Sequence, residues 1–271
     1  MYLAVDVGGS KTLLALFTQD GKIVNKLRII TNPNYQGFIK EIAESIEILK
    51  DAKSLSAAAI AIPGLVDRSR GIGKSFGNLP WHNAPVKKDI GMLVGHVPVL
   101  VENDSNLAGL SEALLVHYKY KKVVYLTVGT GIGGGIIING KIDADFLDSE
   151  PGQMILNYKG KLKKWEDFAS GRAFKTRYGK RASEVTDQAI WQEFSQALAL
   201  GLNELIATLT PDVVIIGGGV GTYFNKFGHF LIQELKKFES DMIKIPPITK
   251  AKRPEEAVLY GCYDFIRQNL A

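Results

Sequence analysis

The sequence has a single cysteine, Cys262, among its 271 residues, and only four histidines. One cysteine excludes a disulfide within the chain and a zinc site made of several thiolates, and it is typical of a reducing compartment. No apolar run approaches the roughly 20 residues that a membrane span needs. The N-terminus starts with a strand-like segment, without the basic start of a signal peptide. These absences predict a cytoplasmic protein with no membrane contact.

Neither sign of charge strongly prevails: lysine and arginine exceed the acidic residues only slightly, which gives a formal net charge of +5. A mild basic balance suits anionic substrates such as nucleotides. No basic run interleaved with aromatic residues stands out, so we interpret the excess as solvated surface and predict no nucleic-acid partner. Hydrophobic residues are 46% and charged residues 23% of the chain, an ordinary globular balance for one large domain or two modest ones.

The pattern of strand, glycine-rich turn and second strand occurs twice, and each copy ends in a hairpin turn signal, Asp20-Gly21 or Asn139-Gly140. We interpret this as two related α/β domains facing each other. The predicted domains are residues 1–116, joined by a C-terminal helix over 255–271, and residues 117–254. Predicted strands are 2–6, 12–17, 22–30, 57–62, 97–101, 123–128, 135–138 and 212–216, and predicted helices are 35–50, 105–116, 187–208 and one from about 254.

The first glycine turn lies in Asp6-Val7-Gly8-Gly9-Ser10-Lys11-Thr12. Glycines at a strand end let the backbone approach a phosphate, and a carboxylate just before such a turn can hold Mg²⁺. We expect Asp6 to support Mg²⁺, with a plain hairpin and a surface Asp6 as the alternative. The expected phosphate-binding residues are Gly8, Gly9, Ser10, Lys11 and Thr12.

Two further glycine clusters follow. The segment Thr127 to Gly135 has five glycines but neither the lysine of a Walker A motif nor the following helix of a Rossmann turn. Backbone contact with a phosphate explains this density better than a turn alone, so Thr130, Gly131 and Gly133 are candidates. Gly217-Gly218-Gly219 follows an apolar strand, where Gly218 and Gly219 suit a nucleotide; a tight strand-to-helix turn is the alternative.

The segment Glu102-Asn103-Asp104-Ser105-Asn106 lies where a buried strand meets a helix. Ligands of open α/β sheets bind at such strand ends. Asn103 and Asp104 are suited to bind a sugar, and Asp104 to accept the hydroxyl proton during phosphoryl transfer. The alternative is simple capping of the helix.

Together these motifs resemble the ROK family of sugar kinases over nearly the whole chain. Further similar segments are Ile62-Pro63-Gly64-Leu65-Val66-Asp67, Asn78-Leu79-Pro80-Trp81 and Phe168-Ala169-Ser170-Gly171-Arg172-Ala173. The resemblance implies the fold of the actin-like (ribonuclease H-like) ATPases, with an interdomain cleft that closes on sugar and nucleotide. It implies an ATP- and Mg²⁺-dependent hexose kinase, with the 6-OH of glucose as the expected acceptor and Asp104 as the base. The implied sugar-binding residues are Gly64, Asn78, Asn103, Asp104, Glu150 and Gln153, and we expect a homodimer.

One departure concerns zinc. The family usually has Glu-x-Gly-His followed by a cysteine cluster, whereas this chain reads Glu150-Pro151-Gly152-Gln153 and has no cysteine nearby. An amide is a poor zinc ligand, so we predict no structural zinc. The loop after Glu150 is then expected to be held by packing of Met154, Ile155, Leu162 and Trp165.

Three alternatives remain open from the sequence. An N-acetylhexosamine or fructose kinase differs only in the acceptor. A sugar-sensing protein without catalysis, like the family's repressors, is disfavoured because the first strand starts at Tyr2 and leaves no room for a preceding DNA-binding helix-turn-helix. An actin-like ATPase without a sugar is disfavoured by Asn103, Asp104 and Glu150.

Overall fold

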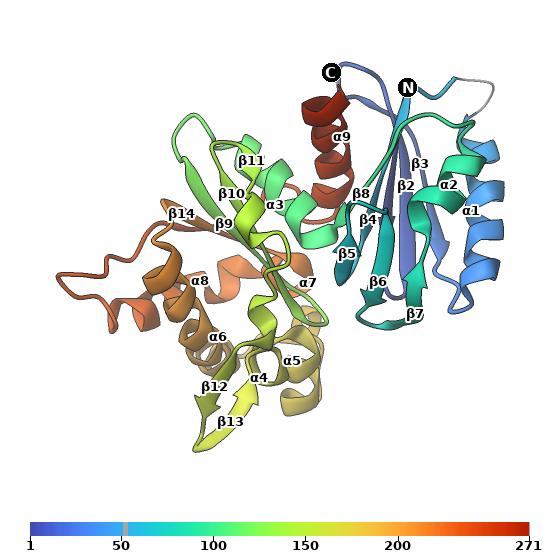
Figure 1. The fold of residues 1–271 in the computed structure, drawn as a ribbon. Coiled ribbons are helices and arrows are strands. Elements are labelled where there is room, and N and C mark those ends of the chain that lie inside the picture. Colours follow the sequence, from blue (N-terminus) through green and yellow to red (C-terminus); the bar gives the residue numbers. More distant parts are fainter. Residues whose placement is uncertain (51–53, 271) are drawn as a thin grey trace. The chain divides into compact units, whose positions relative to one another are not determined.

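The computed structural model describes residues 1–50 and 54–270, which form two compact units. Unit 1 comprises residues 1–111 and 256–271, and unit 2 comprises residues 112–255. Each is an α/β unit with its own five-stranded sheet and its own hydrophobic core (Figure 1). No helix of the described ranges is both long enough and apolar enough to cross a membrane.

The sheet of unit 1 has the strand order β3-β2-β1-β4-β8. Its strands are β1 (Tyr2–Val7), β2 (Lys11–Phe17), β3 (Ile23–Ile30), β4 (Ala57–Ile62) and β8 (Val99–Asn103). Strands β1, β4 and β8 run parallel, whereas β2 and β3 are antiparallel neighbours joined by hairpins. The carboxyl ends of β1, β4 and β8 therefore lie at one edge of the sheet, where ligands of such sheets bind.

The rest of the described part of unit 1 forms a small sheet and four helices. Strands β5 (Leu65–Asp67), β6 (Ile72–Phe76) and β7 (Leu79–Ala84) form the small antiparallel sheet. The helices are α1 (Tyr35–Lys50), α2 (Val86–Leu93), α3 (Asp104–Leu114), whose last residues belong to unit 2, and α9 (Ala257–Leu270). The C-terminal helix α9 packs on β1 and β4, and the alanine-rich sequence of β4 keeps this face of the sheet smooth (Figure 1).

The sheet of unit 2 has the order β11-β10-β9-β14-β15. Its strands are β9 (Lys122–Val128), β10 (Ile132–Ile138), β11 (Lys141–Ile142), β14 (Val213–Gly217) and β15 (Ile248–Lys250). The other elements are the hairpin of β12 (Ile155–Tyr158) and β13 (Lys161–Lys164), helices α4 (Glu166–Ala169), α5 (Gly171–Tyr178), α6 (Gln188–Leu209), α7 (Gly218–Gly221) and α8 (Phe224–Lys236), and three 3-10 turns, η1 (Ala144–Phe146), η2 (Pro151–Gln153) and η3 (Ala182–Glu184).

An aromatic cluster forms much of the core of unit 2. Trp165 and Trp191 are fully buried, and the Trp191 ring is stacked on Phe227 of α8 with a centroid distance of 5.6 Å. Helix α6 supplies the apolar face against α8, beginning after the capping carboxylate of Asp187. Buried aromatic rings provide large apolar areas, so this cluster holds the helices together on one side of the sheet.

The predicted strands and long helices are all present, and no end is shifted by more than three residues. Among the strands the largest shift concerns β10, which begins at Ile132, so that the last three glycines of the Thr127 to Gly135 segment lie in the strand. Gly134 is required by packing, because a Cβ atom there would lie 2.8 Å from Cγ of Pro151 in η2. Of the candidates in this segment, Thr130 and Gly131 therefore lie in the turn between the strands, whereas Gly133 lies in β10.

Candidate functional site

Two carboxylates lie at the carboxyl edge of the sheet in unit 1. Asp6 is near the end of β1, and Asp104 follows β8 directly as the first residue of α3. Burial and, to a smaller degree, the nearby charge of Asp104 raise the pKa of Asp6 to about 7, against the lowering effect of Lys11. Burial raises the pKa of Asp104 to about 6, against hydrogen bonds from Ser105 that lower it. Each carboxylate therefore changes its protonation state near neutral pH, as groups that exchange protons during catalysis do.

The end of β8 is held by an ion pair between the buried Glu102 and the partly buried Arg68. Both oxygens of Glu102 accept hydrogen bonds from Arg68, each at 2.7 Å, and Glu102 also accepts from the backbone N–H of Asn103. Such a bidentate pair fixes geometry as well as adding attraction. Arg68 follows β5, so the pair connects the small sheet to the start of α3. This fixes the position of Asp104 at the edge of the sheet.

Asn103 caps helix α3. Its Oδ1 accepts from the backbone N–H groups of Ser105 and Asn106, and its Nδ2 donates to the carbonyl of Gly64 at 3.0 Å. Helix capping, the alternative role for this segment, is therefore present in the structure. It does not compete with the predicted site, because the capping amide of Asn103 orients the helix that starts with Asp104. The second hydrogen on Nδ2 of Asn103 remains free to donate to a sugar hydroxyl, as predicted. Gly64 lies in the same network, with a φ of +85°.

The first glycine turn packs against the β6–β7 hairpin. The N–H of Gly8 donates to the carbonyl of Lys11 and closes the turn. A Cβ atom on Gly9 would lie 3.1 Å from the Cβ of Asn78, which is at the tip of the hairpin. The structure thus brings Asn78 beside the predicted phosphate turn. Both lie in unit 1, where Gly64, Asn103 and Asp104 also lie.

The polar residues of this turn point in different directions. Ser10 and Lys11 are exposed, as a phosphate contact requires. Thr12 is fully buried, and its hydroxyl lies 2.9 Å from that of Thr31, which donates to the carbonyl of Gly8. The Thr12 hydroxyl therefore supports the turn from inside the unit.

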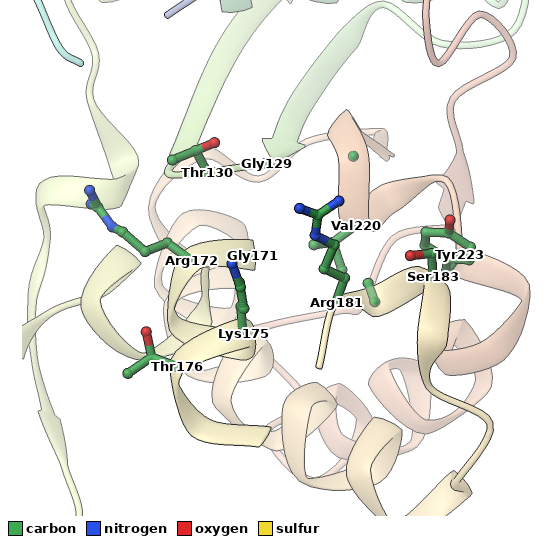
Figure 2. A pocket seen from close by; sticks show the side chains of 12 residues that line it. Gly129, Thr130, Gly171, Arg172, Lys175, Thr176, Arg181, Ser183, Val220 and Tyr223 are labelled. Carbon is green, nitrogen blue, oxygen red and sulfur yellow. The ribbon is translucent and has the colours of Figure 1, made fainter. Parts of the chain in front are cut away.

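Unit 2 contains a pocket beside the second glycine turn, with a volume of about 710 Å³. The carbonyl of Gly129 accepts a hydrogen bond from the N–H of Gly171 at 2.7 Å, which sets the start of α5 against this turn. Figure 2 shows Thr130 and Gly129 on one side of the pocket and Tyr223 on another. Its lining comprises Gly129, Thr130, Gly171, Arg172, Lys175, Thr176, Arg181, Ala182, Ser183, Gly219, Val220 and Tyr223.

Two of the predicted nucleotide-binding residues, Thr130 and Gly219, line this pocket, and so does the neighbouring Gly129. Gly131, Gly133 and Gly218 are outside its lining. Gly218 packs tightly on β9, since a Cβ atom there would lie 2.6 Å from Oγ1 of Thr127. Polar lining residues that were not predicted from the sequence include Lys175, Arg181, Ser183 and Tyr223. For Lys175 and Arg181 the sequence does hold a signal, because lysine and arginine are dense between residues 159 and 181.

Gln153, the residue where the family has histidine, is bonded within its own unit. Its Nε2 donates to Oε1 of Glu166 at 2.9 Å. The same oxygen lies 3.9 Å from the guanidinium of Arg172, and the other Glu166 oxygen accepts from the N–H of Ile132 at 3.4 Å. Glu166 thereby connects the predicted sugar loop to the phosphate turn and to the pocket. Glu150, the other predicted sugar residue of this loop, precedes η2 and is partly buried.

The loop that follows Gln153 is held by aromatic packing. Trp165 is fully buried and donates through Nε1 to the carbonyl of Ala197, and Met154 packs against the core. The predicted roles of Ile155 and Leu162 are wrong, because their side chains are 59% and 75% exposed. Ile155 lies on β12, where exposed and partly buried residues alternate, and Leu162 lies on β13, where all four residues are exposed. Within residues 1–50 and 54–270, no three histidine, cysteine or acidic side chains converge as metal ligands would.

The residues around Asp6 suit a hydrated magnesium ion. The Asp6 carboxylate forms no hydrogen bond with another described residue. Burial and repulsion by the charge of Asp104 disfavour its ionised form and raise its pKa. A dication offsets this repulsion, and Mg²⁺ is commonly held by one or two carboxylates, waters and substrate phosphates. The donor set therefore fits the predicted magnesium ion.

Comparison with known proteins identifies the family. A family model described as the ROK family matches residues 2–269. This chain is a member of the ROK family. It is 26% identical to N-acetyl-D-glucosamine kinase of Haemophilus influenzae, over 96% of this chain and 97% of that protein. It is also 26% identical to a glucokinase of Streptomyces coelicolor, over 80% and 81% of the two chains.

Solved structures of this ROK family agree with the fold. The structure of a glucokinase from Streptomyces griseus, in complex with glucose and AMPPNP, matches with a TM-score of 0.86 and 24% identity. It covers 99% of both chains. The predicted α/β fold of the actin-like ATPases is thereby confirmed.

Proposed function

We propose that this ROK protein is an ATP-dependent hexose kinase that transfers the γ-phosphoryl group to a sugar hydroxyl, with the 6-OH of glucose as the first candidate. The observation that carries the proposal is the Asp104 carboxylate, placed at the carboxyl edge of the sheet with a pKa raised to about 6. A base with such a pKa is ionised at neutral pH and still accepts a proton readily. The Arg68–Glu102 pair and Asn103 hold it in position.

The other residues have positioning roles in this proposal. Asn78, Asn103, Glu150 and Gln153 orient the sugar, together with the Gly64 turn. The backbone of Gly8 and Gly9 and the turn Thr130–Gly131 bind phosphate oxygens, and Gly218 and Gly219 adjoin the nucleoside. Mg²⁺ held near Asp6 supplies charge neutralisation on the phosphates when it is bound. Catalysis then rests mainly on orientation and on removal of the hydroxyl proton by Asp104.

A second acceptor class has specific support. The relatives include N-acetyl-D-glucosamine kinases and a protein described as a putative fructokinase from Bacillus subtilis. Gln153 offers a neutral amide to the acceptor, and its Nε2 already donates one hydrogen bond to Glu166. The acceptor is therefore decided by the few side chains around this loop, and an N-acetylhexosamine is the next candidate.

One assay tests the proposal and separates the acceptors. Purified protein with MgATP is expected to release ADP in the presence of glucose, measured by a coupled assay over a panel of hexoses and N-acetylhexosamines. Activity with an N-acetylhexosamine alone would change the acceptor but not the reaction. ADP release that is independent of every sugar would indicate an ATPase, and no release with any sugar would contradict catalysis.

The pH dependence follows from the two raised pKa values. Both carboxylates must be ionised to act, so kcat/KM is expected to be constant above about pH 8 and to fall as the pH drops through the folded-state pKa values of Asp6 and Asp104, about 7 and about 6. The limiting slope below both values is two if both carboxylates must be ionised. A profile that stays flat down to pH 5 would contradict these roles.

Zinc content gives an independent prediction. The loop after Gln153 is held by Trp165 and by stacking of Tyr158 on Phe168, with ring centroids 4.3 Å apart. We therefore expect elemental analysis to find no stoichiometric zinc. A zinc chelator should change neither the melting temperature nor the activity in excess Mg²⁺. About one zinc per chain, with loss of stability on chelation, would overturn the prediction.

A further inference from the structure

The predicted acceptor loop, residues 150–153, packs against the strand that leaves the second glycine turn, and both belong to unit 2. A Cβ atom on Gly152 would lie 2.2 Å from the carbonyl oxygen of Ile132. A Cβ atom on Gly134 would lie 2.8 Å from Cγ of Pro151. The two backbones therefore approach each other at Gly152 without an intervening side chain. A displacement of the loop must reach the strand that follows the turn.

The segment from Glu166 to Gly171 holds both ends of the same turn. At one end, the N–H of Gly171 donates to the carbonyl of Gly129 at 2.7 Å. At the other end, the N–H of Ile132 donates to Oε2 of Glu166 over a long distance of 3.4 Å. Gly131 leaves room for this carboxylate, because a Cβ atom there would lie 2.5 Å from Oε2. The conformation of the turn therefore depends on where the Glu166 side chain lies.

Glu166 also bonds to the acceptor loop, through its other oxygen. Oε1 accepts from Nε2 of Gln153 at 2.9 Å, and the Glu166 side chain is only 17% exposed. The guanidinium of Arg172 lies 3.9 Å from the same oxygen, too far for a hydrogen bond. The amide oxygen of Gln153 forms no hydrogen bond with any described residue, so it is available to accept from a sugar hydroxyl. The Glu166 carboxylate thus joins the amide that is predicted to bind the sugar to the turn that is predicted to bind phosphate.

We propose that Glu166 is a positioning residue that couples sugar binding to phosphate binding at the Gly129–Gly131 turn. The inference rests on the proposed kinase function, which assigns the sugar to Gln153 and the donor phosphates to the turn. A sugar hydroxyl that donates to Oε1 of Gln153 polarises the amide, and this strengthens the hydrogen bond from Nε2 to Glu166. The carboxylate is then held against Ile132, so the turn is already ordered and phosphate binding costs less conformational entropy. Each ligand must raise the affinity for the other by the same factor.

Glu166→Gln tests this coupling. A carboxylate accepts on both oxygens whereas an amide accepts on only one, so the variant loses the bond from either Gln153 or Ile132. Calorimetry measures the affinity for AMPPNP with Mg²⁺, first alone and then with saturating glucose or N-acetyl-D-glucosamine. The sugar is expected to raise the nucleotide affinity about tenfold in the parent chain and less than about twofold in the variant. Asp167→Asn removes the neighbouring exposed carboxylate and is expected to keep the parent ratio.

Hydrogen exchange gives a readout that needs no nucleotide. Saturating sugar is expected to slow amide exchange at residues 129–132 in the parent chain and in Asp167→Asn, but not in Glu166→Gln. Gly131→Ala tests the same link from the side of the turn. Its Cβ atom must displace Oε2 of Glu166, so this variant is also expected to lose the coupling.

These measurements separate the inference from the kinase proposal. If sugar and nucleotide bind with the expected coupling but no phosphoryl group is transferred, the kinase proposal fails and the role of Glu166 stands. If a sugar is phosphorylated while the affinity ratio is near one in the parent, or unchanged in Glu166→Gln, the inference fails alone. A lower sugar affinity in Glu166→Gln with an unchanged ratio would show that Glu166 is only a sugar contact, which also overturns the inference. Absence of any sugar binding overturns both proposals.

Discussion

Asp104→Asn is expected to reduce phosphoryl transfer by on the order of 10²–10⁴ while leaving sugar binding largely intact. An amide has the same shape as the carboxylate and still accepts the hydrogen bond from the N–H of Ser105, which is 2.7 Å from Oδ1. It has no capacity to take the hydroxyl proton. Steady-state kinetics should place the loss in kcat, and sugar affinity can be measured by calorimetry. Near-normal turnover would falsify the role of Asp104 as the base.

The stability of this variant gives a control for folding. Because the folded-state pKa of Asp104 is raised above its ordinary value of 3.8, ionisation costs the folded state stability above about pH 6. The asparagine variant is therefore expected to melt at a higher temperature than the parent at pH 8, and the difference should shrink toward pH 4. Asp20→Asn removes an exposed carboxylate from the same unit and should leave kcat unchanged. A parallel loss of activity in both variants would point to a general electrostatic effect.

Gly64→Ala is expected to destabilise the protein by roughly 2–4 kcal/mol, combining a strained backbone with a steric clash. Gly64 has a φ of +85°, and an added Cβ atom would lie 2.3 Å from the carbonyl oxygen of Ser75, a backbone atom that cannot move alone. The carbonyl of Gly64 also accepts from Nδ2 of Asn103. Any shift of the turn therefore reaches the cap of α3, and we expect kcat to fall as well. Chemical denaturation and kinetics measure the two effects.

Gly77→Ala is the matched control. Gly77 also has a positive φ, +57°, and follows the neighbouring strand β6, but an added Cβ atom would meet nothing within 4 Å. Only the conformational cost of about 1 kcal/mol is expected, with activity unchanged. Equal destabilisation by the two substitutions would show that the contact with Ser75 is unimportant. An unchanged kcat in a folded Gly64→Ala variant would show that the conformation of the Gly64 turn does not affect the position of Asp104.

The long elements followed from local patterns. The fully apolar run 57–62 became the buried strand β4, and the spacing of apolar residues over 35–50 became helix α1 with the same ends. The short elements were not predicted. Strands β5, β6 and β7 have irregular burial, with register shifts where β6 pairs with its neighbours, so their sequence shows no clear alternation. Their pairing depends on contacts with the rest of unit 1.

The candidate site was predicted unevenly for a similar reason. Glycine turns and the Asn103-Asp104 pair have local signatures, because a turn or a strand end requires particular residues. The partners that orient them come from distant parts of the chain. Arg68 is 34 residues from Glu102, and Glu166 is 13 residues from Gln153. Nothing in the sequence around either residue indicates which partner it meets.

The sequence alone determined the family, the α/β class and the residue types available for phosphoryl transfer, because glycine turns, strand ends and apolar periodicity are local properties of the chain. It also excluded disulfides, since there is only one cysteine. Tertiary structure decided which of these residues face a ligand. It placed Thr12 inside, engaged Gln153 with Glu166 and gathered Lys175 and Arg181 around one pocket. Burial and charge proximity depend on chain segments that meet only in the folded state, so the raised pKa values of Asp6 and Asp104 were decided there too.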